Sequence, residues 1–211
     1  MHFAGLKAVW ESCQKPLEYF DNNINGSVLL FELMQEFWVK NIIFSSSATV
    51  YKVKNDGNWY TETDEVWACS NPYGTTKFLL ENILTDLSKF SWFHVINLRY
   101  FNPIWAHESG CIWEKPNGLP NNLLPYVMKV ATGELEYVNV YGNDYDTIDG
   151  TWVRDYIDVV DLIDGHLKAY EKITKIPLSQ SFPSEEKGDN EKDSFSLGGK
   201  DAWKADRGNY I

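Results

Sequence analysis

Tyr73 and Lys77 are four residues apart in a segment predicted to be helical, and this spacing puts both side chains on one helical face. A nearby ammonium favours phenolate, so we expect Lys77 to lower the pKa of Tyr73 from its ordinary value of about 10. Such a tyrosine can take a proton from an alcohol while a hydride leaves the same carbon. Three serines, Ser45–Ser47, end a predicted strand, and a hydroxyl at that strand end is suited to bond the same substrate oxygen. By itself the Tyr-x-x-x-Lys spacing is a weak signal, because an amphipathic helix start also produces it.

Local patterns predict the elements that carry these residues. Apolar residues at helical spacing predict a helix over 25–37, and the apolar run 41–44 predicts a buried strand stopped by the serines at 45–47. Asn71 followed by Pro72 is typical of a helix N-terminus, and apolar spacing continues this helix through Leu87. The candidate residues therefore lie at a strand end and a helix start.

Later segments continue the alternation of strands and helices. Apolar runs predict strands over 95–98 and 138–141. A helix is predicted over 159–173, with an inward face formed by Val159, Leu162, Ile163, Leu167 and Tyr170. This alternation favours an α/β fold with a parallel sheet, in which a ligand lies beyond the carboxyl ends of the strands. Residues 176–211 lose periodicity and are rich in acids, so we expect a solvated, disordered tail.

The composition limits the possible classes of function. With 211 residues, 44% of them hydrophobic, the chain is long enough for one domain with a sizeable core. A net charge of −11 argues against non-specific binding to nucleic acid or to an anionic membrane, and no apolar run is long enough to span a membrane. The N-terminus has no secretory signal pattern. Cys13, Cys69 and Cys111 are far apart, which favours reduced thiols in a cytoplasmic protein and argues against a metal site.

Further motifs surround the tyrosine and lysine in a fixed order. They are His2-Phe3-Ala4-Gly5-Leu6-Lys7, Asn22-Asn23-Ile24-Asn25-Gly26, Ser45-Ser46-Ser47-Ala48-Thr49-Val50-Tyr51, Asn71-Pro72-Tyr73-Gly74-Thr75-Thr76-Lys77, Leu98-Arg99-Tyr100-Phe101-Asn102-Pro103, Pro120-Asn121-Asn122-Leu123, Tyr141-Gly142-Asn143-Asp144-Tyr145 and Val153-Arg154-Asp155-Tyr156. Over about residues 2–175 this series closely resembles the UDP-glucose 4-epimerases, a family of the extended short-chain dehydrogenase/reductase superfamily. The resemblance implies a partial NAD-dependent epimerase/dehydratase domain over 1–175. Its fold would be a partial Rossmann-type, doubly wound parallel sheet with flanking helices, plus part of a smaller substrate-binding lobe.

The resemblance also implies roles for individual residues. Tyr73 would be the catalytic base, Lys77 would hold the nicotinamide ribose and tune Tyr73, and Ser47 would bond the sugar hydroxyl. The implied contacts to the cofactor NAD are Phe3, Ala4, Gly5, Lys7, Asn22, Ser45, Tyr73, Lys77 and Phe101. The implied contacts to the UDP-sugar are Ser47, Tyr73, Asn102, Asn122, Leu123, Tyr141 and Arg154. The implied reaction interconverts UDP-glucose and UDP-galactose through a 4-keto intermediate, in a homodimer paired through the helix over 25–37 and the Tyr73 helix.

Parts of the family pattern do not occur in this sequence. The glycine-rich G-x-x-G-x-x-G turn and the acidic residue after the family's second strand have no match, so we expect an internal fragment that retains NAD poorly by itself. Two alternatives stay open: another NAD-dependent sugar-nucleotide epimerase or dehydratase, and a truncated, catalytically silent chain. Dehydratases usually need extra acids near the serine position, and Ala48-Thr49-Val50-Tyr51 at that place favours an epimerase.

Tryptophan is the second departure from the family pattern. At five tryptophan positions the family pattern normally has glycine: Trp10, Trp38, Trp105, Trp113 and Trp152. Trp67 is a further candidate for the same difference. We hypothesise that the gene reads UGA as glycine and that this sequence renders UGA as tryptophan. The alternative is real substitution, which would place indoles in tight turns at a strain of about 1 kcal/mol or more each where a positive φ is needed.

Overall fold

The computed structural model describes residues 1–54, 59–67, 69–115, 118–120, 122–140, 142–176 and 194–197. Its contacts divide the chain into two compact units, Met1–Phe101 with Asp164–Ile211, and Asn102–Ile163. No helix in the described ranges is long and apolar enough to cross a membrane. Among the same residues, no group of three or more His, Cys, Asp or Glu side chains is arranged to hold a metal ion.

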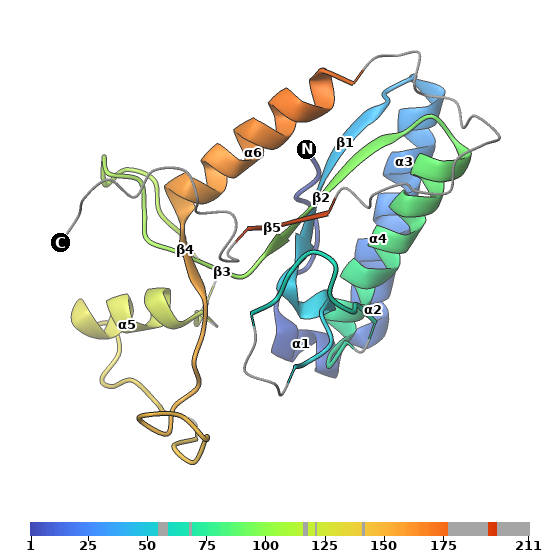
Figure 1. Ribbon diagram of the computed structural model, residues 1–211. Helices are drawn as coiled ribbons and strands as arrows, with labels where there is room; N and C mark the ends of the chain where they lie inside the picture. Colours follow the sequence, from blue (N-terminus) through green and yellow to red (C-terminus); the bar gives the residue numbers. More distant parts are fainter. Residues whose placement is uncertain are drawn as a thin grey trace. The chain divides into compact units, whose positions relative to one another are not determined.

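A parallel sheet forms the centre of the first unit (Figure 1). Strand β1 (Asn41–Ser47) pairs with β2 (His94–Tyr100) in a register that places Ser47 opposite Tyr100. On the other side of β2 lies β5 (Ser194–Leu197), also parallel. The N-terminal segment bonds to the free edge of β1, because the His2 amide donates to the Ile43 carbonyl at 2.8 Å. The predicted parallel sheet is confirmed.

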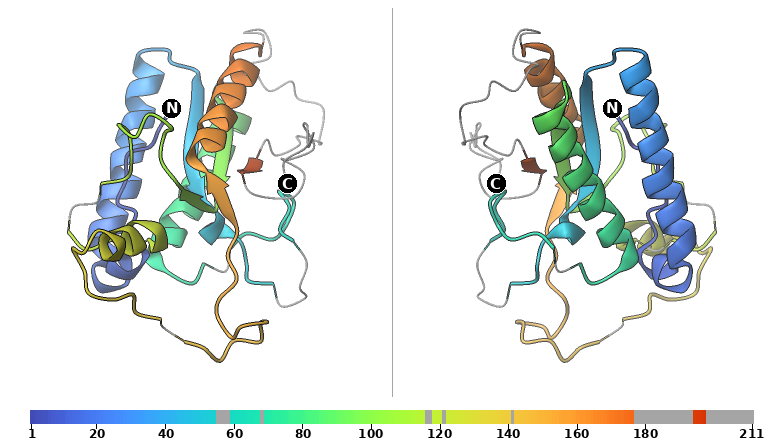
Figure 2. Two further views of the ribbon diagram at one scale, coloured as in Figure 1. Left: turned by 90° about the vertical axis from the view of Figure 1, so that its left-hand side faces the viewer. Right: turned by 90° about the vertical axis from the view of Figure 1, so that its right-hand side faces the viewer.

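Helices cover both faces of this sheet (Figure 2). Helices α3 (Gly26–Glu36) and α4 (Pro72–Phe90) pack on one face, in a core of Phe31, Met34, Ile42, Phe44, Leu80, Leu84 and Phe93. Helix α6 (Val159–Thr174) packs on the other face, in a core of Ile43, Ile96, Leu98, Ala169 and Ile173. Alternate residues of β1 point to opposite sides, so a single strand supplies both cores.

Short helical segments lead from the N-terminus into α3. They are α1 (Val9–Gln14), α2 (Pro16–Phe20) and the π-helical turn η1 (Asp21–Asn25). A 3₁₀ turn, η2 (Ala48–Val50), follows β1 directly. The second unit holds a two-stranded parallel sheet of β3 (Asn102–Ile104) and β4 (Tyr156–Asp158), together with α5 (Leu123–Ala131), none of whose residues is buried.

Four sequence-based expectations differ from the structure. The serines at 45–47 continue β1 rather than stopping it. Residues 138–140 form no strand, and Val140 is exposed. In α6 the buried side is Leu162, His166, Ala169 and Ile173, whereas Ile163, Leu167 and Tyr170 are exposed. Residues 194–197, in the expected disordered tail, pair with β2 because the edge of that strand offers free backbone groups.

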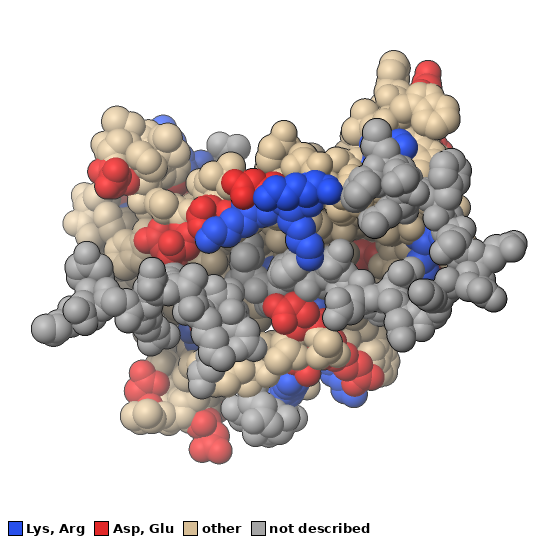
Figure 3. Space-filling model, turned by 45° about the horizontal axis from the view of Figure 1, so that its top comes forward, with Lys and Arg blue, Asp and Glu red and all other residues tan. Residues whose placement is uncertain are grey.

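The charged side chains are mixed on the face drawn in Figure 3. A short row of basic side chains on this face borders acidic ones, and grey atoms cover part of the remainder. One contributing pattern is local pairing along helices, as in the Lys168–Asp164 pair, whose nitrogen and oxygen are 2.7 Å apart. Opposite charges four residues apart on a helix stabilise it only slightly when exposed.

Candidate active site

Lys77 is a buried cation held at the carboxyl end of β1. Its Nζ donates a hydrogen bond to the Ser45 carbonyl at 2.6 Å and lies 4.9 Å from the centroid of the Phe44 ring. The side chain is 5% exposed, and burial lowers its pKa to about 8, with nearby Glu81 acting in the opposite direction. Because this value is above 7, the ammonium remains charged at neutral pH.

Tyr73 and Ser47 lie beside this lysine. The Lys77 Nζ is 5.8 Å from the centroid of the Tyr73 ring, and the Ser47 side chain is close enough to the Tyr73 phenol to lower its pKa as a hydrogen-bonding neighbour. The Ser47 hydroxyl also accepts bonds from the Thr49 amide at 3.2 Å and the Thr49 hydroxyl at 3.0 Å. The structure therefore brings together the three residues that the sequence singled out as catalytic candidates.

The expected lowering of the Tyr73 pKa is wrong for this structure. Burial raises the pKa of Tyr73, and the Ser47 side chain offsets this only in part. Desolvation disfavours the phenolate, while the ammonium of Lys77 directs a donor to the Ser45 carbonyl. The phenol is therefore protonated at neutral pH in this state, and it must lose this proton before it can act as a base.

The first turn of α4 is fixed by contacts from two other segments. The Asn71 side chain caps the helix, accepting a bond from the Gly74 amide at 2.8 Å, and Pro72 follows as predicted. The hydroxyl of Ser12, buried in α1, accepts a bond from the Tyr73 amide at 3.1 Å. A Cβ on Gly74 would lie 3.0 Å from the Thr49 carbonyl, so glycine allows η2 to approach the helix. Tyr73 therefore starts from a rigid backbone.

The expected NAD contacts near the N-terminus form an exposed segment beside β1. Phe3, Ala4, Gly5 and Lys7 are exposed, and the Phe3 ring lies 5.1 Å from the ring of His166. Gly5 has a φ of 157°, and an added Cβ would lie 3.2 Å from the side-chain oxygen of Asn23. These residues lead directly from His2, which is bonded to β1.

Asn23, which the sequence reasoning passed over in favour of Asn22, secures this segment. Its side chain accepts from the Leu6 amide at 2.8 Å and donates to the Leu6 carbonyl at 3.0 Å. The same amide group donates to the Thr76 hydroxyl of α4 at 3.2 Å. Asn22 is exposed and bonds to Asn23 at 2.9 Å. The sequence shows two adjacent asparagines, but only their burial in the structure reveals that Asn23 is the one that holds the segment.

Two further aromatic residues border the strand ends. The Tyr100 hydroxyl is 2.6 Å from Nε2 of His166, and burial raises the pKa of Tyr100 to about 12. This contact joins His166 of α6 to the end of β2. Phe101, an expected NAD contact, has its ring 6.4 Å from the rings of Tyr51 and Tyr60.

The expected UDP-sugar contacts of the second unit form their hydrogen bonds and ring contacts with other residues of that unit. Asn102 donates to the Asp155 carbonyl at 2.7 Å, and Asn122 donates to the carboxylate of Glu114 at 3.1 Å. Leu123 is the exposed first residue of α5. The guanidinium of Arg154 lies 4.5 Å from the centroid of the Trp152 ring, and partial burial lowers its pKa. Tyr141 lies outside the described residues.

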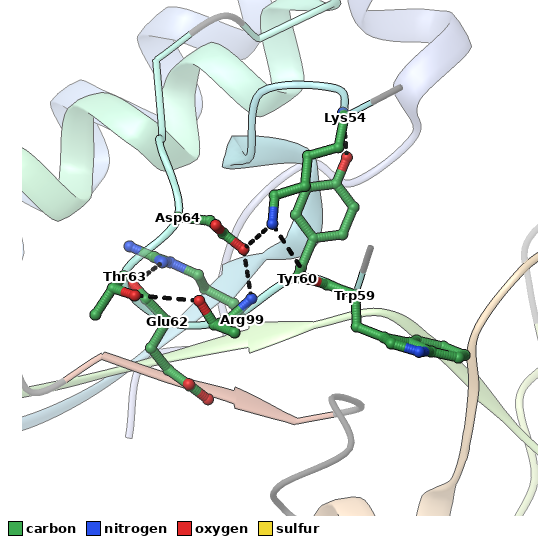
Figure 4. A network of polar contacts seen from close by, with 8 residues as sticks. Lys54, Trp59, Tyr60, Glu62, Thr63, Asp64 and Arg99 are labelled. Atoms are coloured by element: carbon green, nitrogen blue, oxygen red, sulfur yellow. Dashed lines mark hydrogen bonds and ion pairs between the residues drawn. The ribbon is translucent and has the colours of Figure 1, made fainter. Parts of the chain in front are cut away.

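A polar network that sequence reasoning missed lies behind the lysine. Arg99 donates to both carboxylate oxygens of Glu81, at 3.0 and 2.7 Å, and to the Glu62 carbonyl at 3.3 Å. Figure 4 shows Arg99 reaching the 59–64 segment, whose Asp64 forms an ion pair with Lys54 at 2.6 Å. Thr61 completes this turn by donating its amide to Asp64 at 2.6 Å. The only sequence signal was Glu81, one helical turn beyond Lys77.

Comparison with known proteins shows to which protein family this chain belongs. The family described as "NAD dependent epimerase/dehydratase family" matches residues 1–182. The chain belongs to this family. The match covers both the Ser–Tyr–Lys group and the residues of the second unit, and it confirms the family and the Rossmann-type α/β fold expected from the sequence.

Relatives and solved structures narrow the similarity to this family of epimerases. A Bacillus subtilis UDP-glucose 4-epimerase is 57% identical over 175 residues, covering 82% of this chain and 51% of the relative. The Homo sapiens UDP-glucose 4-epimerase is 55% identical over 179 residues, covering 82% and 50%. The chain therefore spans about half the length of the curated relatives it matches.

Solved structures of epimerases superpose on most of this family member. The UDP-glucose 4-epimerase of Stenotrophomonas maltophila, crystallised with NAD and formylated UDP-arabinopyranose, has a TM-score of 0.80 at 42% identity and covers 93% of this chain and 55% of its own. The enzyme of Bifidobacterium longum, crystallised with NAD+ and UDP, has a TM-score of 0.76 at 53% identity, with coverage of 81% and 51%.

Proposed function

We propose that this chain carries the proton-transfer centre of a UDP-glucose 4-epimerase, which interconverts UDP-glucose and UDP-galactose. The observation that carries the proposal is the gathering of Ser47, Tyr73 and Lys77 at one strand end and helix start, in a member of the epimerase/dehydratase family. No other described cluster supplies a hydroxyl, a phenol and a buried ammonium within reach of one sugar oxygen.

The residues present fit the nicotinamide-ribose end of NAD. Lys77 lies near enough to His2 to lower its pKa, and His2 is followed by the exposed residues 3–5. Ser45 and Phe101 lie at the carboxyl ends of the two strands, the edge at which parallel sheets bind ligands. Lys7 and Asn22 are expected to contact the rest of the cofactor. Bound there, NAD would supply a reversible hydride acceptor for the sugar.

The chain's own residues move and hold the proton. Tyr73 accepts the proton of the sugar hydroxyl through its phenol oxygen and later gives it back. The charged Lys77 stabilises the phenolate form of Tyr73 that accepts this proton, since an opposite charge nearby favours the ionised form. Ser47 hydrogen-bonds the same sugar oxygen and so keeps it aligned with Tyr73.

The second unit is proposed to bind the nucleotide part of the substrate. Arg154 has the planar donor fork that suits phosphate oxygens. Asn102, Asn122, Leu123 and Tyr141 are proposed as further contacts to the UDP-sugar. The related structures crystallised with UDP or a UDP-sugar support this substrate class.

A replacement chimera tests the proposal. The 175 aligned residues of the Bacillus subtilis relative are replaced by those of this chain, and UDP-galactose turnover is measured with and without Ser47→Ala, Tyr73→Phe and Lys77→Met. We expect the chimera to turn over UDP-galactose and each of the three substitutions to abolish this turnover. The circular dichroism spectrum should be the same in all four proteins. A folded chimera that retains NAD yet does not act on UDP-galactose would overturn the proposal and favour the silent chain or another sugar nucleotide.

The isolated 211-residue chain is the matched control. Titration with NAD, followed by quenching of tryptophan fluorescence, reports whether this chain alone holds the cofactor. We expect weak or no saturation, because the sequence has no glycine-rich phosphate turn.

We also propose a homodimer and a cytoplasmic location. The outer sides of α3 and α4 expose Leu29, Leu33, Phe37, Leu79 and Phe90, and a groove beside them is lined partly by Gln35, Ile83 and Leu87. Helix-helix pairing would remove this apolar surface from water. Leu33→Asp should convert a dimer to a monomer in light scattering, and a monomeric parent chain would contradict the pairing. The three cysteines are free, which suits a reducing compartment.

A further inference from the structure

Three charged side chains are buried together behind the candidate active site. Lys77 and Glu81 are one turn apart on α4 and reach consecutive residues of β1: Lys77 donates to the Ser45 carbonyl, and the Ser46 hydroxyl donates to Glu81. Arg99 of β2 forms a two-pronged ion pair with Glu81. None of the three charged residues is more than 5% exposed.

The cluster holds two cations and one anion. Burial of a charge is unfavourable unless an opposite charge and hydrogen bonds compensate it. Arg99 is compensated by Glu81, the Glu62 carbonyl and the face of Tyr51, whose ring centroid is 4.8 Å from the guanidinium. Among the described residues, no carboxylate lies within ion-pair distance of the Lys77 ammonium. Glu81 is therefore the nearest acid that can also stabilise its charge. The stabilisation of the Lys77 ammonium therefore depends on how strongly the Glu81 carboxylate is already engaged by Arg99.

We propose that Glu81 and Arg99 are positioning residues for Lys77. The Glu81 carboxylate keeps the Lys77 ammonium charged and directed at the end of β1, and the ion pair between Glu81 and Arg99 weakens the electrostatic stabilisation that Glu81 gives to Lys77. The consequence for catalysis rests on the proposed function. The charge balance itself is a property of this chain and can be tested without turnover.

Other titratable groups face Lys77 from each element around it. Tyr73 lies on α4, Tyr100 on β2, and His2 on the N-terminal segment, where burial and the lysine charge lower the pKa of His2. His2 is neutral near pH 7, and both phenols are protonated there, so none of them supplies a charge at that pH. Glu81 and Arg99 are the charged groups that remain to act on Lys77.

The test is the titration of Lys77 in the 211-residue chain, followed by NMR with isotope-labelled lysine. Lys77→Met identifies the signal. Glu81→Gln should move the midpoint down by about one pH unit or more, because Arg99 is left uncompensated beside the lysine. Arg99→Met should move it up, because Glu81 then serves Lys77 alone. Opposite shifts support the proposal, and no shift in either variant overturns it.

Two control variants keep this test decisive. Asp86→Asn removes an exposed acid of α4 and should leave the Lys77 midpoint unchanged. Arg99→Lys keeps the charge beside Glu81 and should likewise give nearly the parent midpoint, whereas a rise equal to that of Arg99→Met would contradict a charge effect. If Glu81→Gln does not fold, as judged by circular dichroism, the contrast between Arg99→Met and Arg99→Lys carries the decision.

The chimera links the same variants to catalysis. There, Glu81→Gln and Arg99→Met should shift the pH profile of turnover in opposite directions with similar KM values. An inactive parent chimera would count against the proposed function alone, since the NMR titration stands without it. Shifted NMR midpoints with unshifted pH profiles would overturn the catalytic role of the pair.

A second, independent inference concerns Trp38 and Trp105. Their φ angles are 55° and 70°, and they are the only non-glycine residues with positive φ among the described parts of the chain; the others are six glycines. Trp38 follows α3 in a capping turn, with its amide donating to the Gln35 carbonyl at 3.2 Å and the Val39 amide to the Met34 carbonyl at 2.8 Å. This pair of bonds defines the helix ending whose left-handed position is usually glycine.

The side chains do not explain these conformations. Both indoles are exposed, although Trp38 stacks on Trp92 with ring centroids 5.5 Å apart. A side chain in this backbone region is strained, and glycine is not. Trp10, Trp113 and Trp152 are also exposed, which is unusual for so large an apolar side chain.

We infer that positions 38 and 105 are glycine in the protein as its organism makes it, encoded by UGA. The codons give the direct test: UGA at 38 and 105 with UGG at Trp92 is expected, and UGG at 38 and 105 overturns the inference. A second measurement uses the protein itself. Trp38→Gly and Trp105→Gly should each raise the denaturant midpoint, whereas Trp92→Gly should lower it because Trp92 packs on the core. Lower midpoints for both Trp38→Gly and Trp105→Gly would contradict glycine conformations at these positions.

Discussion

The candidate catalytic residues and the candidate substrate contacts are held in very different ways. Ser47, Tyr73 and Lys77 stand on a strand and a helix that share a core, and buried bonds fix their backbone and side chains. Arg154 and Asn122, in the second unit, bond or stack only with neighbours in that unit and are exposed. For the proposed function, this difference means that the first unit would preorganise the catalytic residues, whereas substrate binding would depend on less constrained side chains.

Tyr73→Phe should have the largest effect. In the chimera it removes the group that exchanges the proton, so turnover of UDP-galactose should fall by about 100- to 10,000-fold. KM should change little, because the ring remains. Measurement of kcat and KM for both proteins checks this, and a loss confined to KM would place Tyr73 among the binding residues instead.

Core packing should separate the two units next. Leu84 is fully buried in α4, and Leu84→Ala should lower the free energy of unfolding by about 2–5 kcal/mol, because it leaves a cavity. Leu123→Ala, at an exposed position of α5, should change it by no more than about 0.5 kcal/mol. Urea denaturation of the 211-residue chain measures both, and equal losses would contradict the difference in packing.

Lys77 should make stability depend on pH. Its pKa in the folded chain is about 8, below the value of about 10.4 in an unfolded chain. Between these values the unfolded state binds more protons, so stability rises with pH and the burial penalty on the lysine is relieved. Relative to Lys77→Met, the parent chain should gain up to ~3 kcal/mol between pH 8 and about 10.4. Tyrosines with raised pKa values titrate in both proteins, so their effect cancels. A difference between the two proteins that stays constant with pH would contradict this.

Arg154→Ala should have the smallest effect, and on binding alone. Loss of charge-assisted bonds to phosphate should weaken UDP binding to the chimera by about 10- to 100-fold, because such bonds contribute about 1.5–3 kcal/mol. Isothermal titration with UDP measures this. An unchanged Kd would show that Arg154 does not contact the substrate. The first unit would then be the only one with support for its proposed role.

Local sequence signals predicted the strands and the helix that carry the catalytic candidates. Asn71-Pro72 predicted the start of α4, and the apolar runs predicted β1 and β2, because caps and buried strands depend on residues close in sequence. The spacing of Tyr73 and Lys77 predicted their common face for the same reason.

Properties set by distant residues were not predictable. The raised pKa of Tyr73 comes from burial, which no spacing reports. The inward side of α6 was misjudged because its small Ala169 and polar His166 approach the sheet, while larger apolar residues remain outside. Glu81 and Arg99 meet only because α4 and β2 pack side by side. The partial match to family-specific motifs supplied the roles that physical patterns alone left open.

Deuterium transfer in the chimera tests the central claim most directly. The substrate is UDP-galactose carrying deuterium at carbon 4, and the product is analysed by mass spectrometry and NMR. If Ser47, Tyr73 and Lys77 transfer the hydroxyl proton while hydride stays on the enzyme, the UDP-glucose formed keeps its deuterium at carbon 4. Exchange of that deuterium with water, or equal turnover in the Tyr73→Phe chimera, would contradict the account.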